Sequence, residues 1–486
     1  NACDPVGPVM ELPGRLVTPG FTDAHTHFNN LGQSLSLVSL KGLCSISDCR
    51  EKIRAAAVRI PPGEWIVGWG WNHNQWVDQR EPNRNDLDDI TPDHPVMMVR
   101  TCTHSIWVNT RALNVAGLHA ASPEPPGGRI DREPVTGHPS GLIREARDLI
   151  QVHIPAPTLE ARKAYLMTAQ EAALRLGFTG VHTMESLDEW AAADALEREG
   201  RLKIRLYHLF QGDELEAVAR RRIVPGSGSD HLWFGHAKFF ADGSMGAKTA
   251  LMHEPYEDDP SDFGIPFLEP AMLYERVAQA CSQGWSVAIH AIGDKAVTHA
   301  LDAIAGARQS FPGRLPDRIE HIQVSRPEDL RRFCPLGVVA SVQPIFVATD
   351  WPAADRLWGK RCCRGYVWKT MLETGIATQF GSDSPIEPID FRFGLHAAVT
   401  RQTVDGQPAG GWYPDQRLTL AQAIRGFTFQ PAITSGKGAS LGTLSPGKWA
   451  DMTVFRQNLF DLTPDEWLTA EAEMTIVEGE IVFQQS

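Results

Sequence analysis

A regular alternation of strand-like and helix-like segments between residues 176 and 400 restricts the fold more than any other feature of the sequence. The strand-like segments are short and rich in β-branched or aromatic residues, and they cover 177–184, 204–210, 236–242, 286–292, 318–324, 338–344 and 377–383. Amphipathic stretches such as 159–176 and 271–283 separate them. This alternation is typical of βαβ units and predicts an α/β fold with a parallel sheet.

One more strand leads into His25, which brings the predicted number of parallel strands to eight. Eight parallel strands with helices outside form a (β/α)8, or TIM, barrel, and this is the fold we predict. A doubly wound open sheet is the alternative. No G-x-G-x-x-G motif follows the first strand, which disfavours a dinucleotide site.

Two further regions fall outside the repeating pattern. Residues 28–176 separate the first two strands, far more than a βα connection needs, and we expect an insertion there that forms much of a substrate pocket. Turn and strand patterns at 442–455 and 474–483 predict a small β-sandwich subdomain built from the chain ends, 1–17 and 417–486, beside a barrel over 18–416. The chain opens with Asn1 and a short lead, so we expect the N-terminal part of this subdomain to be truncated.

Composition excludes several classes of partner. The net charge of −13 disfavours nucleic acid and anionic membranes, and no apolar run approaches the ~18 residues of a membrane span. The eight cysteines show no repeated C-x-x-C pattern. We therefore expect reduced thiols and a cytoplasmic protein.

His25 and His27 stand two residues apart at the end of the first predicted strand. Residues i and i+2 of a strand point to the same side, so this pair aims two imidazoles at one point. Such an arrangement suits a metal ion, although two histidines at this spacing are more often ordinary surface or core residues.

The remaining barrel strands supply the other ligands that a metal site would need. Active sites of such barrels lie at the C-terminal ends of the strands. The fourth strand carries Lys238, the fifth ends at His290, the sixth at His321 and the eighth at Asp383. The histidines lie one βα unit apart and Asp383 lies two units further on, which predicts a metal site at this rim.

Each of these residues has a plainer interpretation when it is taken alone. His290 could be a packed core histidine, and Lys238 could belong to a buried ion pair. Asp383 could cap the following helix, and His321 could form a hydrogen-bonded core pair with Glu320. The metal interpretation is favoured because all of them fall on the same rim.

The chain resembles the amidohydrolase superfamily, in particular the YtcJ-like branch known as amidohydrolase family 3. Besides the residues above, the resemblance rests on Gly-Trp-Gly-Trp at 68–71, Trp107-Val108-Asn109, Gly141-Leu142-Ile143-Arg144-Glu145, Asp242-Gly243-Ser244, Gly293-Asp294, Gln343-Pro344, Gly381-Ser382-Asp383-Ser384-Pro385 and Leu444-Ser445-Pro446-Gly447-Lys448.

The resemblance implies a binuclear metallohydrolase. Lys238 would be carbamylated by CO2 and bridge two divalent metal ions, with zinc the expected metal. His25, His27 and Asp383 would hold one ion, and His290 and His321 the other. The implied reaction is hydrolysis of a C–N bond in an amide, N-substituted formamide or cyclic amide, with Asp383 as general base and then acid.

The expected partner is a small-molecule substrate, and a homodimer is possible. Alternatives on the same metal site are a deaminase, an esterase or an isomerase, and a non-catalytic metal-binding protein is a further one.

Five residues are candidates for substrate contact. Trp71 and Trp107 would line an aromatic pocket, or else form the insertion's own core. His104 and Glu145 match family positions that would face the site. His182 ends the second strand, where a buried hydrogen-bonded histidine is the equal alternative.

Overall fold

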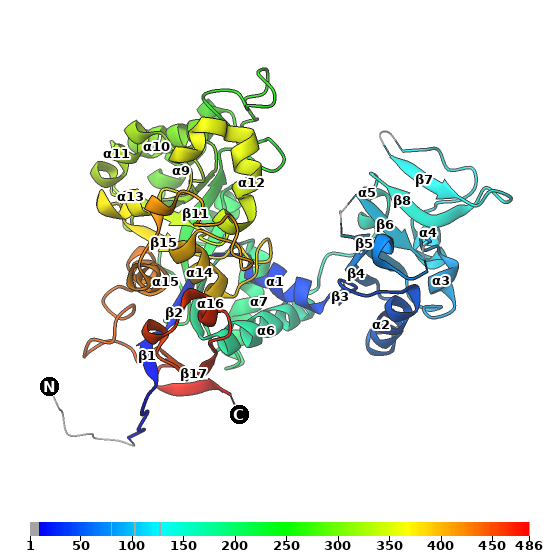
Figure 1. Ribbon diagram of the computed structural model, residues 1–486, viewed down its shortest axis with the longest axis horizontal. Coiled ribbons are helices and arrows are strands. Elements are labelled where there is room, and N and C mark those ends of the chain that lie inside the picture. The colour runs from blue at the N-terminus through cyan, green and yellow to red at the C-terminus, as the bar shows by residue number, and fades with distance from the viewer. Residues whose placement is uncertain (1–8, 79, 102–103, 126–127, 486) are drawn as a thin grey trace. The chain divides into compact units, whose positions relative to one another are not determined.

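The computed structural model describes residues 9–78, 80–101, 104–125 and 128–485 (Figure 1). The chain forms two compact units, one from Asn1–Gly32 with Leu159–Ser486 and one from Gln33–Thr158. Each unit has its own sheet and its own hydrophobic core.

The larger unit contains an eight-stranded parallel sheet. Its strands run in the spatial order β2 (Phe21–Thr26), β9 (Phe178–Glu185), β10 (Arg205–Gln211), β11 (Leu232–Phe240), β12 (Ser286–Ala291), β13 (Arg318–His321), β14 (Val339–Val342) and β15 (Thr378–Phe380). Every neighbouring pair is parallel. The predicted α/β barrel is therefore confirmed as a nearly closed parallel sheet.

Hydrogen bonds beyond β15 bring the last strand to the first. The Asp23 carboxylate accepts bonds from the backbone N–H of Ser382 at 3.0 Å and from its hydroxyl at 2.5 Å. The Asp383 N–H donates to the His25 carbonyl at 2.7 Å. A side chain at Gly381 would place its Cβ 2.4 Å from the His25 nitrogen, so this closure requires glycine.

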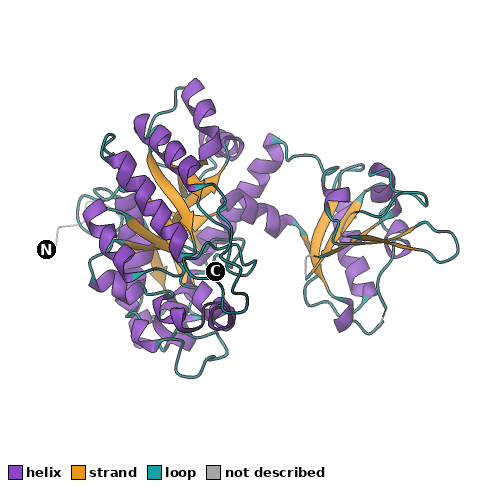
Figure 2. Cartoon of the chain, turned by 90° about the horizontal axis from the view of Figure 1, so that it is seen from above, coloured by secondary structure: helices purple, strands orange, loops and turns teal. Residues whose placement is uncertain are grey.

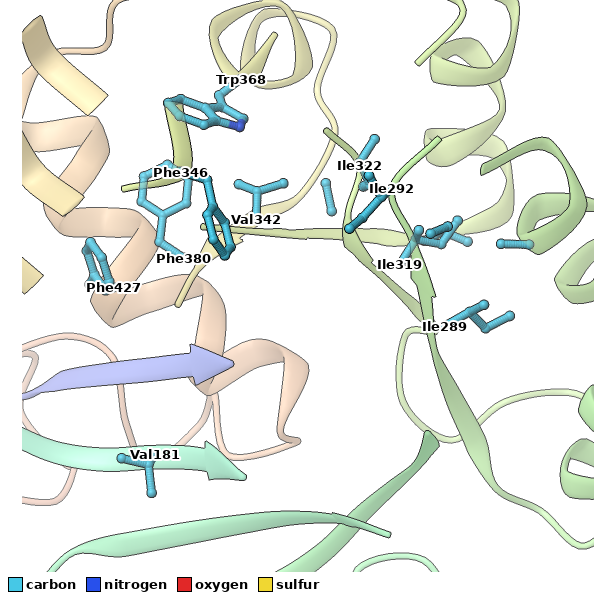
Figure 3. Close-up of a cluster of buried hydrophobic side chains, with 14 of the residues drawn as sticks. Val181, Ile289, Ile292, Ile319, Ile322, Val342, Phe346, Trp368, Phe380 and Phe427 are labelled. Carbon is cyan, nitrogen blue, oxygen red and sulfur yellow. The ribbon is translucent and has the colours of Figure 1, made fainter. Parts of the chain in front are cut away.

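Helices surround the barrel strands, as Figure 2 shows for the larger unit. They are α6 (Leu159–Leu176), α7 (Leu187–Arg198), α8 (Leu215–Arg220), α9 (Pro270–Ser282), α10 (Asp294–Arg308), α11 (Pro327–Leu336), α12 (Phe346–Trp358), α13 (Trp368–Glu373), α14 (Phe391–Thr400) and α15 (Leu420–Thr434). Outward-facing strand residues such as Ile289, Ile319 and Val342 are buried among apolar side chains (Figure 3). The opposite, inward-facing residues are then free to be polar.

Helix α15 belongs to the barrel, which differs from the prediction that placed 417–486 in the terminal subdomain. It packs on β2 and β15, and the rings of Phe427 and Phe380 lie 5.6 Å apart between their centroids. The amphipathic pattern of this helix does not reveal which sheet its apolar face meets.

A four-stranded antiparallel sheet joins the two ends of the chain. It has the order β1 (Leu16–Pro19), β16 (Met452–Phe455), β17 (Ala472–Val477) and β18 (Glu480–Gln484). The short helix α16 (Pro464–Trp467) lies between β16 and β17 in sequence and packs on α14. Residues 1–8 of the predicted subdomain lie outside the described part of the chain.

The smaller unit is a folded α/β domain rather than an irregular loop. Its six-stranded sheet has the order β3 (Val38–Ser39), β4 (Ile66–Trp71), β5 (Val96–Arg100), β6 (Ser105–Val108), β8 (Pro139–Arg144) and β7 (Arg129–Arg132). Its helices are α2 (Ile46–Arg59), α3 (Asn85–Asp88), α4 (Thr110–Val115) and α5 (Asp148–Gln151), and α1 (Phe28–Ser36) spans the boundary between the units. Separate apolar clusters form around Trp71 and around Ile106.

None of the helices in the described ranges is long and apolar enough to cross a membrane. The cysteines in the same ranges, Cys44, Cys49, Cys281, Cys334, Cys362 and Cys363, are free thiols.

Candidate metal centre

His25, His321 and Asp383 bring their donor atoms together at the C-terminal rim of the barrel. One ligand atom from each of these three buried residues lies within 4.8 Å of the others. The Asp383 Oδ1 is 3.3 Å from His25 Nε2 and 3.4 Å from His27 Nε2. The donor atoms of the H-x-H pair and of the aspartate therefore lie close together, although these residues are at opposite ends of the barrel sequence.

The second nitrogen of each of these histidines is held by an oxygen atom. His25 Nδ1 lies 2.6 Å from Glu320 Oε2, His27 Nδ1 lies 3.2 Å from the Met184 carbonyl, and His321 Nδ1 lies 2.8 Å from Gln343 Oε1. A neutral ring in such a contact carries its hydrogen on Nδ1 and presents the Nε2 lone pair to the centre. This donor set fits a divalent metal ion that accepts imidazole and carboxylate ligands.

His290 joins the cluster in a different orientation. Its ring centroid lies 4.4 Å from that of His321. Its Nε2 is 2.9 Å from the Gly243 carbonyl oxygen, so Nδ1 is the nitrogen left to bind a metal ion. Burial lowers the pKa of His290 to about 3, which keeps the ring neutral at physiological pH.

Lys238 is buried inside the barrel, below this rim. Its Nζ lies 3.3 Å from the Met184 sulfur, and no carboxylate of a described residue lies within 4.0 Å of it. The structure thus gives no support to a buried ion pair. Burial lowers the pKa of Lys238 to about 8, so a substantial fraction of the amine is neutral near that pH.

Asp383 is not a helix cap. Helix α14 begins after Asp390, whose side chain accepts the hydrogen bond of the cap. Burial would raise the pKa of Asp383, but the neighbouring His25 and His27 rings outweigh burial and hold it well below its ordinary value. The carboxylate is therefore ionised and available to a metal ion.

Two site residues adopt left-handed backbone conformations that are costly for residues other than glycine. The φ angle is 63° at Asp383 and 76° at His321. Such conformations cluster at functional sites because the surrounding structure must hold them there. Both residues belong to the group whose donor atoms converge at the rim.

A buried charged pair supports His25. It consists of Arg318, which the sequence did not single out, and Glu320, which the sequence offered only as a partner of His321. Arg318 and Glu320 are both fully buried, and Arg318 Nε donates to Glu320 Oε1 at 2.5 Å. Arg318 also donates to the Ala24 carbonyl and to the Ser341 hydroxyl. Both charged residues occupy alternate positions of one barrel strand, and two charges inside a predicted buried strand were the available signal.

His182 lies in the barrel interior, where it is hydrogen-bonded. Its Nδ1 is 3.1 Å from Arg318 Nη1, and its ring centroid is 4.7 Å from that of Tyr207. Burial and the nearby Arg318 charge lower its pKa well below the ordinary value. This placement favours the core interpretation of His182 over substrate contact.

The other substrate candidates belong to the smaller unit. Trp71 and Trp107 are completely buried there, and their indole N–H groups donate to the carbonyls of Met98 and Asn83. This environment favours the packing interpretation of both tryptophans. His104 and Glu145 form an exposed pair, with Nδ1 and Oε2 2.9 Å apart. A substrate role for any of the four stays a prediction.

The barrel and its buried histidine–aspartate cluster are those of a metal-dependent hydrolase. The model of the amidohydrolase family matches residues 9–483, and the chain belongs to this family. The putative amidohydrolase YtcJ of Bacillus subtilis is 33% identical to it, over 98% of this chain and 90% of that protein.

Solved structures agree with this assignment. Uncharacterized metal-dependent hydrolases from Pyrococcus horikoshii OT3 and Pyrococcus furiosus are each 32% identical, with TM-scores of 0.77 and 0.76. The first alignment covers 94% of this chain and 89% of that one, and the second 93% and 89%.

An N-substituted formamide deformylase of Arthrobacter pascens is 26% identical over 100% of this chain and 92% of its own length.

Proposed function

We propose that this protein hydrolyses the C–N bond of an amide, an N-substituted formamide or a cyclic amide. The observation that carries the proposal is the convergence of His25, His321 and Asp383 at one buried point, with an oxygen atom holding the remote nitrogen of each histidine. The name of the Arthrobacter relative supports N-substituted formamides as one substrate group.

We propose that the site holds two divalent ions and that both are zinc. His25, His27 and Asp383 would hold one ion, His290 and His321 the other, and Lys238 would bridge them as a carbamate. Such ions supply a water of lowered pKa and polarise the scissile carbonyl group. A lysine ammonium has no lone pair, so Lys238 can serve only after it has reacted as the neutral amine, and its low pKa favours that form.

Asp383 is the residue that moves protons in this proposal. Burial lowers the pKa of both His290 and His321, so both rings are neutral at neutral pH and neither has an acidic second proton to donate. The ionised Asp383 carboxylate accepts the proton of the attacking water and then delivers it to the leaving nitrogen. Once that proton is removed, the water oxygen attacks the carbonyl carbon and forms the C–O bond. Delivery of the proton to nitrogen lets the C–N bond break, and the products are a carboxylic acid and a neutral amine.

The test combines metal analysis with a substrate screen. The protein is treated with zinc and bicarbonate, its metal content is measured, and it is offered formamides, N-acyl amines and lactams. We expect bound zinc and release of amine from at least one group. A protein that retains no zinc and releases no amine from any of them would overturn the proposal.

A further inference from the structure

An aromatic side chain stands directly beside the candidate metal centre. Phe240 ends β11 two residues after Lys238, so both side chains point into the barrel from the same strand face. The Phe240 ring centroid lies 5.3 Å from that of His290 and 5.1 Å from Lys238 Nζ. Phe240 therefore lies directly beside two of the candidate metal ligands.

A second aromatic ring continues from Phe240 toward solvent. The segment after β11 returns to the strand end, where the Phe267 N–H donates to the Ala241 carbonyl at 2.9 Å and Asp242 forms an isolated bridge with Pro266. The ring centroids of Phe267 and Phe240 lie 5.4 Å apart. Phe267 is 67% exposed, so the two rings form a continuous apolar surface that leads outward from His290.

Apolar side chains also follow two other strands at the same rim. Phe346 begins α12 after β14, and its ring centroid lies 6.4 Å from that of His321. Ile386 follows Asp383 by three residues and is 69% exposed. Phe240 and Phe346 thus place apolar rings beside two of the candidate ligands, His290 and His321.

The loop that carries Phe267 offers no free cation. Lys248 is the single lysine or arginine in residues 241–269. Its ammonium is paired with Asp258 at 3.0 Å and Asp262 at 3.4 Å. A negatively charged substituent lying on this surface would lose water without gaining a partner, which is costly.

From this surface we infer that the site takes amides with a neutral, apolar substituent, preferably a ring, and that Phe240 and Phe267 bind this substituent. Flat rings stack on aromatic side chains in offset or edge-to-face geometry, which favours a phenyl group over a small alkyl group. The inference rests on the proposed function and specifies its substrate class. It makes Phe267 a specificity-determining residue rather than a catalytic one.

The test compares matched substrates and matched variants. N-(2-phenylethyl)formamide and N-methylformamide share the scissile bond and differ in the substituent, and the corresponding acetamides form a second pair. Phe267→Ala removes the outer ring, and Phe460→Ala is the control. Phe460 is 55% exposed on η5 (Leu459–Asp461), after β16 of the terminal sheet.

We expect the zinc-treated protein to prefer the phenylethyl substrate of a pair. Phe267→Ala should lower kcat/KM for that substrate about tenfold, mainly through KM, with little change for the methyl substrate. Phe460→Ala should leave both unchanged. Equal losses for both substrates, or no loss for either, would overturn the inference while the hydrolase proposal stands.

A binding measurement separates this inference from the proposed function. Titration calorimetry with N-(2-phenylethyl)acetamide is run on Asp383→Asn, alone and combined with Phe267→Ala. Binding that weakens in the double variant would support the aromatic surface even if no amide is hydrolysed. Equal binding by both variants would overturn the inference without reference to turnover.

Discussion

Asp383 combines an unusual backbone conformation with a charged side chain that lies beside two histidines. Its backbone is left-handed, and its carboxylate lies between the Nε2 atoms of His25 and His27. The backbone conformation aims the side chain, and the two rings keep it ionised. We therefore expect substitutions here to affect chemistry more than folding.

The Asp383→Asn variant tests this expectation directly. The amide has nearly the same shape but cannot accept a proton, so turnover per bound zinc should fall by roughly 10²–10⁴-fold. Circular dichroism and thermal unfolding should show the fold retained. Turnover per zinc close to that of the parent protein would rule out Asp383 as the proton carrier.

Glu320→Gln tests the support behind His25. Glu320 accepts from both His25 and Arg318, whereas the NH2 group of glutamine must face one of these donors. If it faces His25, the ring is driven to the tautomer with hydrogen on Nε2, which cannot ligate. Zinc affinity, measured by competition with a chromophoric chelator, should fall by roughly 10–100-fold.

The control for Glu320→Gln is the same substitution at the exposed Glu216 of α8. That variant should bind zinc like the parent protein. An unchanged zinc affinity in Glu320→Gln would show that the carboxylate only fills space in the barrel.

Lys238 gives a prediction about pH. Burial lowers its pKa to about 8, and only the neutral amine reacts with CO2. The rate at which metal-free protein is activated, with dissolved CO2 held constant, should rise with pH through about 8 and level off above it. If Lys238 had the ordinary pKa of a lysine, the activation rate would still be rising at pH 10. A stopped assay after timed exposure to zinc and CO2 measures this rate.

The sequence could supply the positions of the candidate ligands but not their supports. His25, His290, His321 and Asp383 were found because the C-terminal ends of parallel strands meet at one rim, a property of the barrel itself. The partnership of Glu320 with His25 depends on which residues face each other across the barrel. That information comes from closure of the sheet, through contacts between segments nearly 300 residues apart.

At the scale of elements, helix α15 shows where pattern analysis fails. Its helical character was predicted, yet its place beside β2 and β15 was not. The helix approaches β15 so closely that a Cβ at Gly426 would lie 2.5 Å from the Phe380 ring. In the sequence, this contact leaves no sign except a glycine within a helix. A helical glycine alone does not reveal which neighbour it approaches.

Gly426→Ala should therefore destabilise the protein although alanine favours helices. Overpacking against Phe380 should reduce the free energy of unfolding by about 1–3 kcal/mol. At the exposed Gly306 near the end of α10 a Cβ meets nothing within 4 Å, so Gly306→Ala should raise stability, by at most about 1 kcal/mol. Urea unfolding of both variants checks the signs, and a stabilising Gly426→Ala would contradict the close approach.

The strand–helix alternation predicted the barrel strands well because their outward faces are continuously apolar. The long segment after the first strand was less predictable. It was expected to line a pocket, and it forms a six-stranded sheet with apolar clusters of its own. Its tryptophans gave no guide, because aromatic residues serve equally well in a pocket and in a core.

At the scale of the whole molecule, the smaller unit has the features of a segment that folds by itself. Residues 33–158 hold a complete sheet with buried side chains on both of its faces. We expect this segment, produced alone, to unfold cooperatively in urea. A shorter segment ending at residue 138 lacks β8, which lies between β6 and β7, and should not fold. Absence of a cooperative transition in 33–158 would show that it depends on the rest of the chain.

The hydrogen bonds behind the candidate ligands have a consequence for how the protein acquires its metal. Glu320, Gln343 and the Met184 carbonyl orient three imidazoles, and strained backbone at His321 and Asp383 is held by the barrel. The barrel thus supplies its own supports for the candidate ligands, unlike a domain whose fold waits for its metal. We expect the empty protein to be folded and long-lived, so that supply of metal and CO2, rather than synthesis, decides when it becomes active.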